Sequence, residues 1–397
     1  MSEINAGIFK KEEGGSSPEL IGKTELTSPY FMVPPSGTTA QRPAGCAPGT
    51  LRFNTDIGSL EYFKGDTLGW ESIVKTTPNL GGGTGSNKGT GARGIFAGGH
   101  TGPTGPGYTN EMDFLTISTL GNTQDFGDLS AARGNGVGGM ASRTRGIVWG
   151  GIPAGTQIDK VTIASAGTGA ASFGTANLYT EGGSGCSNNI RAIQGGGFDR
   201  PNSNAQAGTL QYITIASEGA SVTFGGLSTP STDQRSIYAG SFASSTRGIW
   251  GGGDSVGVSN INIMSYVTIM TTGNSVDFGD METGAYNVVG CSNSTRGLFF
   301  GGTNPTPAGH LNKIQYSTIA TLGNTIDFGD LVFTGTSYFT GGQNCASSTR
   351  AIAAGGNGGG TNIMEYVQIA TTGNAQDFGD CAMKFNGAGF SNGHGGL

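Results

Sequence analysis

Short runs of β-branched and aromatic residues recur from residue 93 to the end of the chain, and none follows the period of an α-helix. Residues 264–270 (MSYVTIM) and 364–369 (MEYVQI) are the clearest runs. Glycine clusters bound them on both sides, which is typical of strands separated by turns. This region is therefore predicted to be all-β, without a helix between the strands.

The strand pattern repeats about every 50 residues, and two markers define six copies. In the first marker an arginine precedes a small residue, an apolar pair and glycines, at Arg93, Arg145, Arg191, Arg247, Arg296 and Arg350. The second marker is Phe-Gly, with its aromatic ring at Phe126, Phe173, Phe224, Phe278, Phe328 and Phe378. Repeats of this length indicate an array of similar structural units.

Each copy contains four predicted strands, so the six copies predict a six-bladed β-propeller over residues 93–397. A Gly-Asn pair such as Gly121-Asn122 or Gly273-Asn274 predicts a tight hairpin before the Phe-Gly strand. Residues 385–392 match 286–293, which leaves one strand over at the C-terminus. This strand is expected to pair with the Arg93 strand and close the ring; residues 83–92 are the alternative source of the closing strand.

The glycine clusters and the repeat length resemble those of kelch-type propellers. The resemblance covers about three quarters of the chain. It implies the architecture of a propeller and no particular activity, because one fold hosts many functions.

The region before the repeats has a different composition and a different pattern. Residues 1–45 are rich in Pro, Gly, Ser and Thr and are expected to form an extended arm. Alternating apolar positions in residues 46–77 predict a three-stranded meander, which is too small to be stable alone and should pack on a partner or on a copy of itself. Residues 78–92 form a glycine-rich linker.

The meander resembles a short module of bacteriophage tail fibres and other phage appendages. The matching segments are residues 38–43 (TTAQRP), 49–56 (GTLRFNTD) and 60–62 (LEY), followed by Trp70. The Asp-Phe-Gly-Asp repeats are similar to those of virion structural proteins from marine phages. Together these resemblances imply a structural protein of a phage particle, in which Arg52, Phe53, Tyr62 and Trp70 belong to the module that docks on the virion.

Charge and composition limit the kinds of partner that the protein is expected to bind. The net charge is −6 and no Lys/Arg-rich run occurs, so nucleic acid is not an expected partner. The sequence has neither an apolar run long enough for membrane insertion nor the features of a signal peptide. Five cysteines without Cys-x-x-Cys spacing are expected to be reduced. Three of them, Cys186, Cys291 and Cys345, precede a repeat arginine by five residues and should fill an apolar position.

Few residues are suited to catalysis, since the chain has only three histidines, at positions 100, 310 and 394. We expect no enzyme activity, no cofactor and no metal site. The four Asp-Phe-Gly-Asp copies leave calcium as an alternative, although the carboxylates are expected to cap turns or meet a repeat arginine. The six arginines are expected to form hydrogen bonds at strand ends, with an anion-attracting channel as the alternative.

Loops that follow the glycine clusters differ most among the copies, which indicates recognition on one rim of the propeller. The candidate contact residues are His100, Tyr108, Arg200, Asp254 and His310. Expected partners are other virion proteins, a host-surface glycan, and further copies of the chain bound through the arm. The main alternative to a virion protein is a free, lectin-like propeller that binds carbohydrate. An enzyme is the third possibility.

Overall fold

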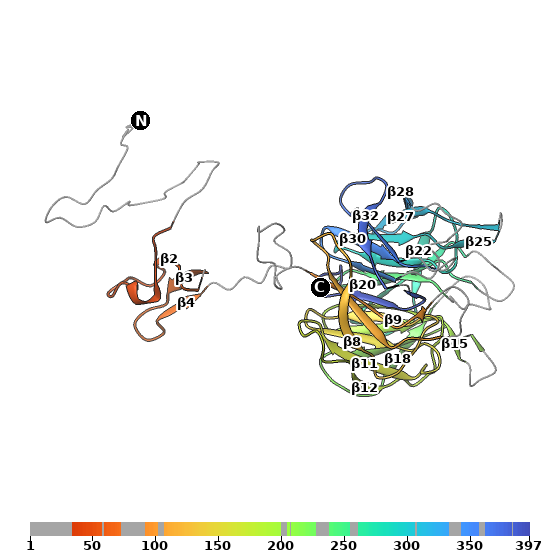
Figure 1. Cartoon of the computed structure of the whole chain (residues 1–397), viewed down its shortest axis with the longest axis horizontal. Coiled ribbons are helices and arrows are strands. Elements are labelled where there is room, and N and C mark those ends of the chain that lie inside the picture. Colours follow the sequence, from red (N-terminus) through yellow and green to blue (C-terminus); the bar gives the residue numbers. More distant parts are fainter. Residues whose placement is uncertain are drawn as a thin grey trace. The chain divides into compact units, whose positions relative to one another are not determined.

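The computed structural model describes residues 34–57, 59–72, 92–101, 107–199, 205–206, 208–227, 238–254, 261–305, 308–332, 343–356, 362–382 and 384–397. The described residues contain strands, turns and one 3-10 helix but no α-helix, so the protein is all-β. The chain divides into two compact units, Met1–Thr76 and Thr77–Leu397 (Figure 1). Residues 1–33 of the predicted arm and 73–91, which include nearly all of the linker, lie outside the described residues.

The first unit is a four-stranded sheet in the order β1-β2-β3-β4. The predicted meander supplies β2 (Leu51–Asn54), β3 (Ser59–Phe63) and β4 (Trp70–Ser72), which are antiparallel. The structure adds β1 (Ser36–Gly37), which lies parallel to β2 and precedes the 3-10 helix η1 (Thr39–Gln41). The amides of Phe53 and Thr55 donate to the carbonyls of Pro35 and Gly37, so the end of the predicted arm belongs to this sheet.

The described part of the second unit contains six four-stranded antiparallel sheets, named sheets 1 to 6 after the order of their arginines. Sheet 1 is β34 (Ala388–Ser391), β5 (Arg93–Ala97), β7 (Glu111–Thr116) and β8 (Gln124–Asp128). Sheet 2 is β9 (Gly138–Ala141), β10 (Arg145–Trp149), β11 (Gln157–Thr162) and β12 (Ala171–Thr175). Sheet 3 is β13 (Ser184–Ser187), β14 (Arg191–Gly195), β17 (Thr209–Thr214) and β18 (Val222–Gly226).

The remaining three sheets have the same design. Sheet 4 is β19 (Gly240–Ala243), β20 (Arg247–Gly251), β21 (Ile263–Thr268) and β22 (Val276–Asp280). Sheet 5 is β23 (Val289–Ser292), β24 (Arg296–Phe300), β27 (Lys313–Thr318) and β28 (Ile326–Asp330). Sheet 6 is β29 (Gln343–Ala346), β30 (Arg350–Ala354), β31 (Ile363–Gln368) and β32 (Gln376–Asp380).

Sheet 1 takes its first strand from the end of the chain. The C-terminal strand β34 pairs antiparallel with β5, and the register runs from Ala388 opposite Ala97 to Ser391 opposite Gly94. The first strands of successive sheets are neighbours in space: β9 contacts β13, then β19, β23, β29 and β34 follow, and β34 contacts β9. This succession is a propeller-like arrangement, in which the first strand of each sheet lies closest to a common axis.

Three two-stranded sheets lie at the glycine clusters that end second strands. Two are hairpins, β15 (Phe198–Asp199) with β16 (Ala205–Gln206) and β25 (Thr303–Pro305) with β26 (Ala308–His310). In the third, β6 (His100–Thr101) pairs with β33 (Lys384–Phe385) from near the C-terminus. The glycines allow the chain to turn there. At Gly99 φ is 111°, and a Cβ would lie 2.7 Å from the carbonyl oxygen of Phe385.

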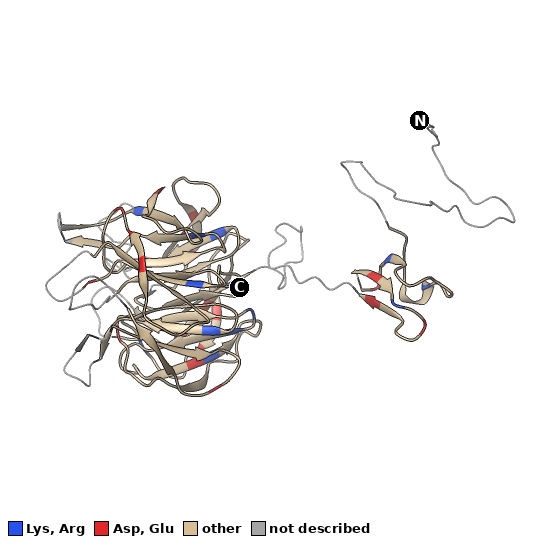
Figure 2. Cartoon of the chain, turned by 180° about the vertical axis from the view of Figure 1, so that it is seen from behind, with Lys and Arg blue, Asp and Glu red and all other residues tan. Residues whose placement is uncertain are grey.

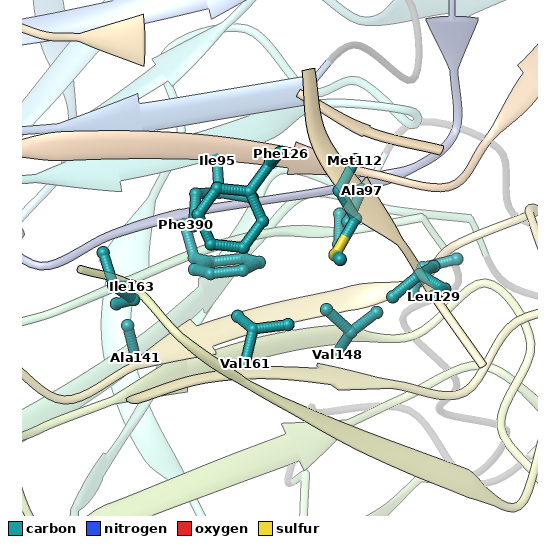
Figure 3. Close-up of a cluster of buried hydrophobic side chains, with 12 residues drawn as sticks. Ile95, Ala97, Met112, Phe126, Leu129, Ala141, Val148, Val161, Ile163 and Phe390 are labelled. Atoms are coloured by element: carbon teal, nitrogen blue, oxygen red, sulfur yellow. The ribbon is translucent and has the colours of Figure 1, made fainter. Parts of the chain in front are cut away.

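Apolar side chains fill the space between neighbouring sheets. In the cluster between sheets 1 and 2, Phe126 and Phe390 lie against Val148 and Val161 (Figure 3). Phe126 is the ring of a Phe-Gly marker, and it is fully buried. Equivalent rings, such as Phe278 and Phe328, are buried in the other clusters, so this marker packs adjacent sheets together.

The Gly-Asn pairs do not form the tight hairpin that the sequence predicts. Strand β7 ends at Thr116 and β8 begins only at Gln124, so Gly121-Asn122 lies inside a longer connection. The amide of Gly121 donates to the carbonyl of Phe378 in sheet 6, and Asn122 Oδ1 accepts from the amide of Asp380 at 3.0 Å. The pair thus binds the neighbouring sheet, a role that a pattern of local turn residues does not reveal.

Candidate functional site

The first unit is held together by a buried carboxylate. Glu61 on β3 is fully buried, and its oxygens accept from Arg42 Nη2 at 2.6 Å and Asn54 Nδ2 at 3.1 Å. Arg52 Nη1 lies 3.6 Å from the same carboxylate. The hydrogen bond from Arg42 holds the pKa of Glu61 below its usual value. Glu61 was not recognisable from the sequence, because its burial depends on arginines that come from separate segments.

The face of this sheet that carries the apolar residues of the predicted meander is largely uncovered in the described structure. Leu51 lies opposite Tyr62 and Phe53 opposite Leu60 in the register of β2 and β3. Leu51 is 48% exposed and Leu60 38% exposed, while Phe53 and Tyr62 are half-buried. The opposite face holds Arg52 and Glu61 with Phe63. These four residues, Leu51, Phe53, Leu60 and Tyr62, are named the apolar face.

The sequence-predicted docking residues therefore fall into two groups. Phe53 and Tyr62 lie on the apolar face, where Tyr62 also donates a hydrogen bond to Glu71 at 3.4 Å. Arg52 is buried, donates to the carbonyl of Thr38 at 3.0 Å and lies 5.8 Å from the ring of Trp70. Arg52 is thus buried, whereas Phe53, Tyr62 and Trp70 are all half-buried. Trp70 lies opposite Phe63, on the other face from Phe53 and Tyr62.

The six repeat arginines join neighbouring sheets. Each donates from Nη1 to the carbonyl of an isoleucine in the next sheet, and the last one reaches sheet 1; the pairs are Arg93 with Ile163, Arg145 with Ile215, Arg191 with Ile269, Arg247 with Ile319, Arg296 with Ile369 and Arg350 with Ile117. Five of the guanidinium groups also lie over an aromatic ring of their own sheet, as Arg296 does over Tyr316 at 4.8 Å.

Two of the candidate rim residues come together. His100 is stacked on Phe385 with ring centroids 4.7 Å apart, and Tyr108 lies at the same centroid distance on a tilted plane. His100 Nε2 is 2.6 Å from Asn135 Oδ1. Asn135 Nδ2 in turn donates to Glu181 at 3.4 Å, so the cluster reaches from sheet 1 toward sheet 3.

The structure describes two of the other three rim candidates. His310 is exposed on β26, where its Nδ1 lies 3.2 Å from the hydroxyl of Thr303. Asp254 is half-buried and directly follows the glycine cluster of sheet 4. Arg200 lies outside the described residues.

A buried ion pair lies between sheets 1 and 2. Arg133 Nη2 donates to Asp159, and both side chains are fully buried. Asp159 also accepts from the amide of Ser130, and Arg133 donates to the carbonyl of Gln157 at 3.1 Å. Burial lowers the pKa of Arg133, while the nearby carboxylate opposes that shift. This pair was not predicted from the sequence, because neither residue belongs to a repeat marker.

At one end of the first strands, serine hydroxyls bridge neighbouring sheets and the C-terminal tail lies among them. Ser187, Ser292 and Ser391 donate to the carbonyls of Ala141, Ala243 and Ala346 on the adjacent first strands. Serine and alanine thus alternate around the axis. His394 lies among these strands with Nε2 2.9 Å from the carbonyl oxygen of Ala141, and burial lowers its pKa to about 4.

A partly open cavity of about 110 Å³, named the axial cavity, lies toward the other end of these first strands. Its lining comes from the first strands of the six sheets and from the residues just before them. Glycines and polar uncharged side chains predominate, and the described lining residues include no Lys, Arg, Asp, Glu or His. Figure 2 likewise shows charged residues scattered sparsely over this unit.

Two further features of the described ranges are the side chains that could bind a metal ion and the thiols of the cysteines. No group of three His, Cys, Asp or Glu side chains there is placed to hold a metal ion. In the Asp-Phe-Gly-Asp segment of sheet 1, which lies within β8, Asp125 Oδ1 accepts from the amide of Gly127 at 3.0 Å. Cys186, Cys291 and Cys345 are buried and free, and burial raises the pKa of each thiol. No helix among the described residues is long and apolar enough to cross a membrane.

A comparison of the chain with models of protein families gives no match. A comparison with curated proteins gives no match either.

Proposed function

We propose that residues 93–397 form a closed six-bladed β-propeller and that the protein is a non-enzymatic structural component of a phage particle. The ring is supported by contacts that repeat from sheet to sheet and return to the start. The Arg350 guanidinium of sheet 6 donates to the carbonyl of Ile117 in sheet 1, and β34 contacts both β29 and β9. Each sheet then corresponds to one blade, and no blade presents a free side at the end of the array.

The observation that carries the proposed role is the apolar face of the first unit. A sheet of this size buries little apolar surface of its own, and Leu51, Phe53, Leu60 and Tyr62 leave a further apolar patch open to a neighbour. The same residues lie within the segment that resembles a phage appendage module. We infer that this face docks on another virion protein, where burial of the patch stabilises the contact.

The propeller is proposed to face outward and to make contacts through its rim. The His100, Tyr108 and Phe385 cluster offers aromatic surface next to the polar groups of Asn135. Such a combination suits a host-surface glycan or a neighbouring virion protein. His310 on the β25–β26 hairpin would contribute a second contact point on the loops after the glycine clusters.

A free, lectin-like propeller is the second candidate, because the uncharged polar lining of the axial cavity suits a carbohydrate in either setting. Mass spectrometry and antibody labelling of purified phage particles distinguish the two. Recovery of the full chain in particles at a fixed copy number supports the virion role. Its presence only in the soluble fraction of lysed host cells would favour the free lectin.

A further inference from the structure

Exposed apolar side chains of the second unit gather at one end of its strands. This end is named the arginine end, because the second strands begin there with the repeat arginines; the glycine clusters lie at the opposite, glycine end. The third strands end at the arginine end, since Thr268 lies opposite Arg247 and Thr318 opposite Arg296. The exposed large apolar side chains in the described part of this unit include Val332 at the glycine end and, at the arginine end, Leu120, Ile190, Val222, Met270, Val276, Leu322 and Ile326.

Five of these side chains come from sheets 3, 4 and 5 and are named the outer patch. They are 45–61% exposed: Val222, Met270, Val276, Leu322 and Ile326. Three of them are the first residues of the fourth strands β18, β22 and β28. Each of these three lies opposite a half-buried tyrosine of the third strand, as Val276 does opposite Tyr266. The patch therefore recurs at the same place in three consecutive sheets.

The junction between sheets 4 and 5 carries apolar side chains from both sheets. The amide of Gly323 in sheet 5 donates to the carbonyl of Phe278 on β22 at 2.8 Å. Leu322 directly precedes this glycine, so it lies beside the strand that begins with Val276. An exposed leucine and an exposed valine thus flank the same junction.

The junction between sheets 3 and 4 has the same arrangement. Arg191 of sheet 3 donates to the carbonyl of Ile269 in sheet 4, and its guanidinium lies 4.6 Å from the centre of the Tyr212 ring. Met270 directly follows Ile269, and Val222 lies opposite Tyr212 in the register of β17 and β18. Met270 and Val222 are therefore brought to one junction from different sheets.

Polar residues occupy the equivalent positions of the other sheets. At the junction of sheets 2 and 3, Lys160 stands in place of the tyrosine, and its ammonium group forms an ion pair with Glu218 of the next sheet. Sheets 1 and 6 have Gln124 and Gln376 where sheet 4 has Val276. The fold thus accepts polar side chains at these positions. An apolar patch that the fold does not require is typical of an interaction surface.

The charges beside the outer patch select its partner. Val276 and Ile326 are each followed by an exposed aspartate, Asp277 and Asp327. The patch of a second copy would bring like charges together, and a nucleic acid or an anionic lipid surface would also be repelled. A protein surface with an apolar centre and lysine or arginine at its border would complement both the apolar side chains and the carboxylates.

We propose that the outer patch makes a second contact with the particle, on a virion protein whose apolar surface is bordered by lysine or arginine. The first unit remains the anchor, and the patch turns the arginine end toward the particle and the glycine end outward. The described part of the second unit starts at Ala92, directly before Arg93, so the chain from the first unit enters it at the arginine end. The inference rests on the virion role of the proposed function.

The experiment uses full-length chains supplied to a phage that lacks its own copy, and quantitative mass spectrometry counts the copies retained on washed particles. Val276→Ser and Ile326→Ser should each lower the copy number about three- to tenfold, because apolar burial is lost. The control Val332→Ser changes an equally exposed valine at the glycine end and should leave the number unchanged. Asp327→Lys should also lower it, whereas Asp330→Lys, at the other end of β28, should not. Melting temperatures should stay near that of the unaltered chain, because the altered side chains are exposed.

Two results would overturn the inference alone. One is an equal copy number for the patch variants and for Val332→Ser on particles that carry the unaltered chain. The other is a dimer of the purified chain, seen by light scattering, that Val276→Ser and Ile326→Ser dissociate, which would make a second copy the occupant. Absence of the unaltered chain from particles would instead overturn the virion role, and the inference with it, so the two failures are distinguishable.

Discussion

At the residue scale, the repeat arginines show how a single side chain links two sheets. The guanidinium of Arg296 donates to the carbonyls of Ile369 and Ala370 at 3.0 and 2.9 Å and lies over Tyr316. Both bonds come from the one nitrogen Nη1, so it is the planar group stacked on the ring that the compact ammonium of lysine could not reproduce. The sequence predicts hydrogen bonding at strand ends for these arginines, and the structure identifies the acceptors as carbonyls of the next sheet.

Arg296→Ala should lower the free energy of unfolding by about 2 kcal/mol, because two charge-assisted hydrogen bonds and a cation–π contact are lost. Chemical denaturation measures the change. Arg143→Ala is the matched control: this arginine is exposed and only its backbone amide has a described bond, so the change should stay within about 0.5 kcal/mol. Equal effects of the two substitutions would contradict the linking role.

His394 makes stability depend on pH. Its Nε2 lies 2.9 Å from the carbonyl oxygen of Ala141 and its Nδ1 accepts from the amide of Gly396, so the neutral ring is paired on both sides. Its pKa is about 4 in the folded protein and 6.5 in its reference state. As the pH falls, the unfolded chain binds a proton on His394 at a higher pH than the folded protein does. The contribution of His394 to the free energy of unfolding is therefore complete above pH 6.5 and is lost as the pH falls toward 4.

Between pH 6.5 and pH 4, the contribution of His394 to the free energy of unfolding should fall by on the order of 3 kcal/mol. Unfolding is measured at pH 7.5 and 4.5 for the unaltered chain and for His394→Gln, which should show a smaller decrease. The exposed His310→Ala serves as the control and should retain the decrease of the unaltered chain. An identical pH dependence in His394→Gln would rule out this histidine as the cause.

At the element scale, recurring local patterns were sufficient to place most strands and to predict the pairing of the C-terminal strand with the Arg93 strand, which is confirmed. Other tertiary partners were not predicted. The alternation in residues 46–77 identifies β2, β3 and β4, yet β1 is only two residues long and has no pattern of its own. Gly121-Asn122 has the composition of a hairpin, but its hydrogen bonds go to sheet 6. Glu61 is buried through arginines distant in sequence. Such contacts depend on tertiary neighbours, which a single sequence does not display.

The strand β34 provides an element-scale test. Deletion of residues 385–397 removes the partner of β5 and exposes its hydrogen-bonding edge, so the protein should aggregate or lose much of its stability. A shorter deletion of residues 393–397 keeps β34 and should be tolerated better. Light scattering and thermal melting measure both effects. A protein without residues 385–397 that remains as soluble and heat-stable as the full chain would show that β34 is dispensable.

At the scale of the whole molecule, the two units carry two different surfaces. The first unit, Met1–Thr76, exposes the apolar face, and the second, Thr77–Leu397, contains the rim cluster and the axial cavity. The repeat made the all-β sheets predictable, because each copy carries the same markers. The cavity was not predictable, because Ser184, Asn287 and Asn344 come from three different copies of the repeat and only the fold brings them to one cavity.

The central proposal is that the first unit joins the particle and the propeller makes the outer contacts. The most direct measurement compares particle incorporation of the full chain with that of a chain beginning near Pro78, using purified particles from a phage that lacks its own copy. We predict that the shortened chain is soluble and folded but absent from particles, whereas Tyr108→Ala, Arg200→Ala and His310→Ala variants are incorporated normally. Normal incorporation of the shortened chain would mean that the propeller is the docking surface and would contradict this account.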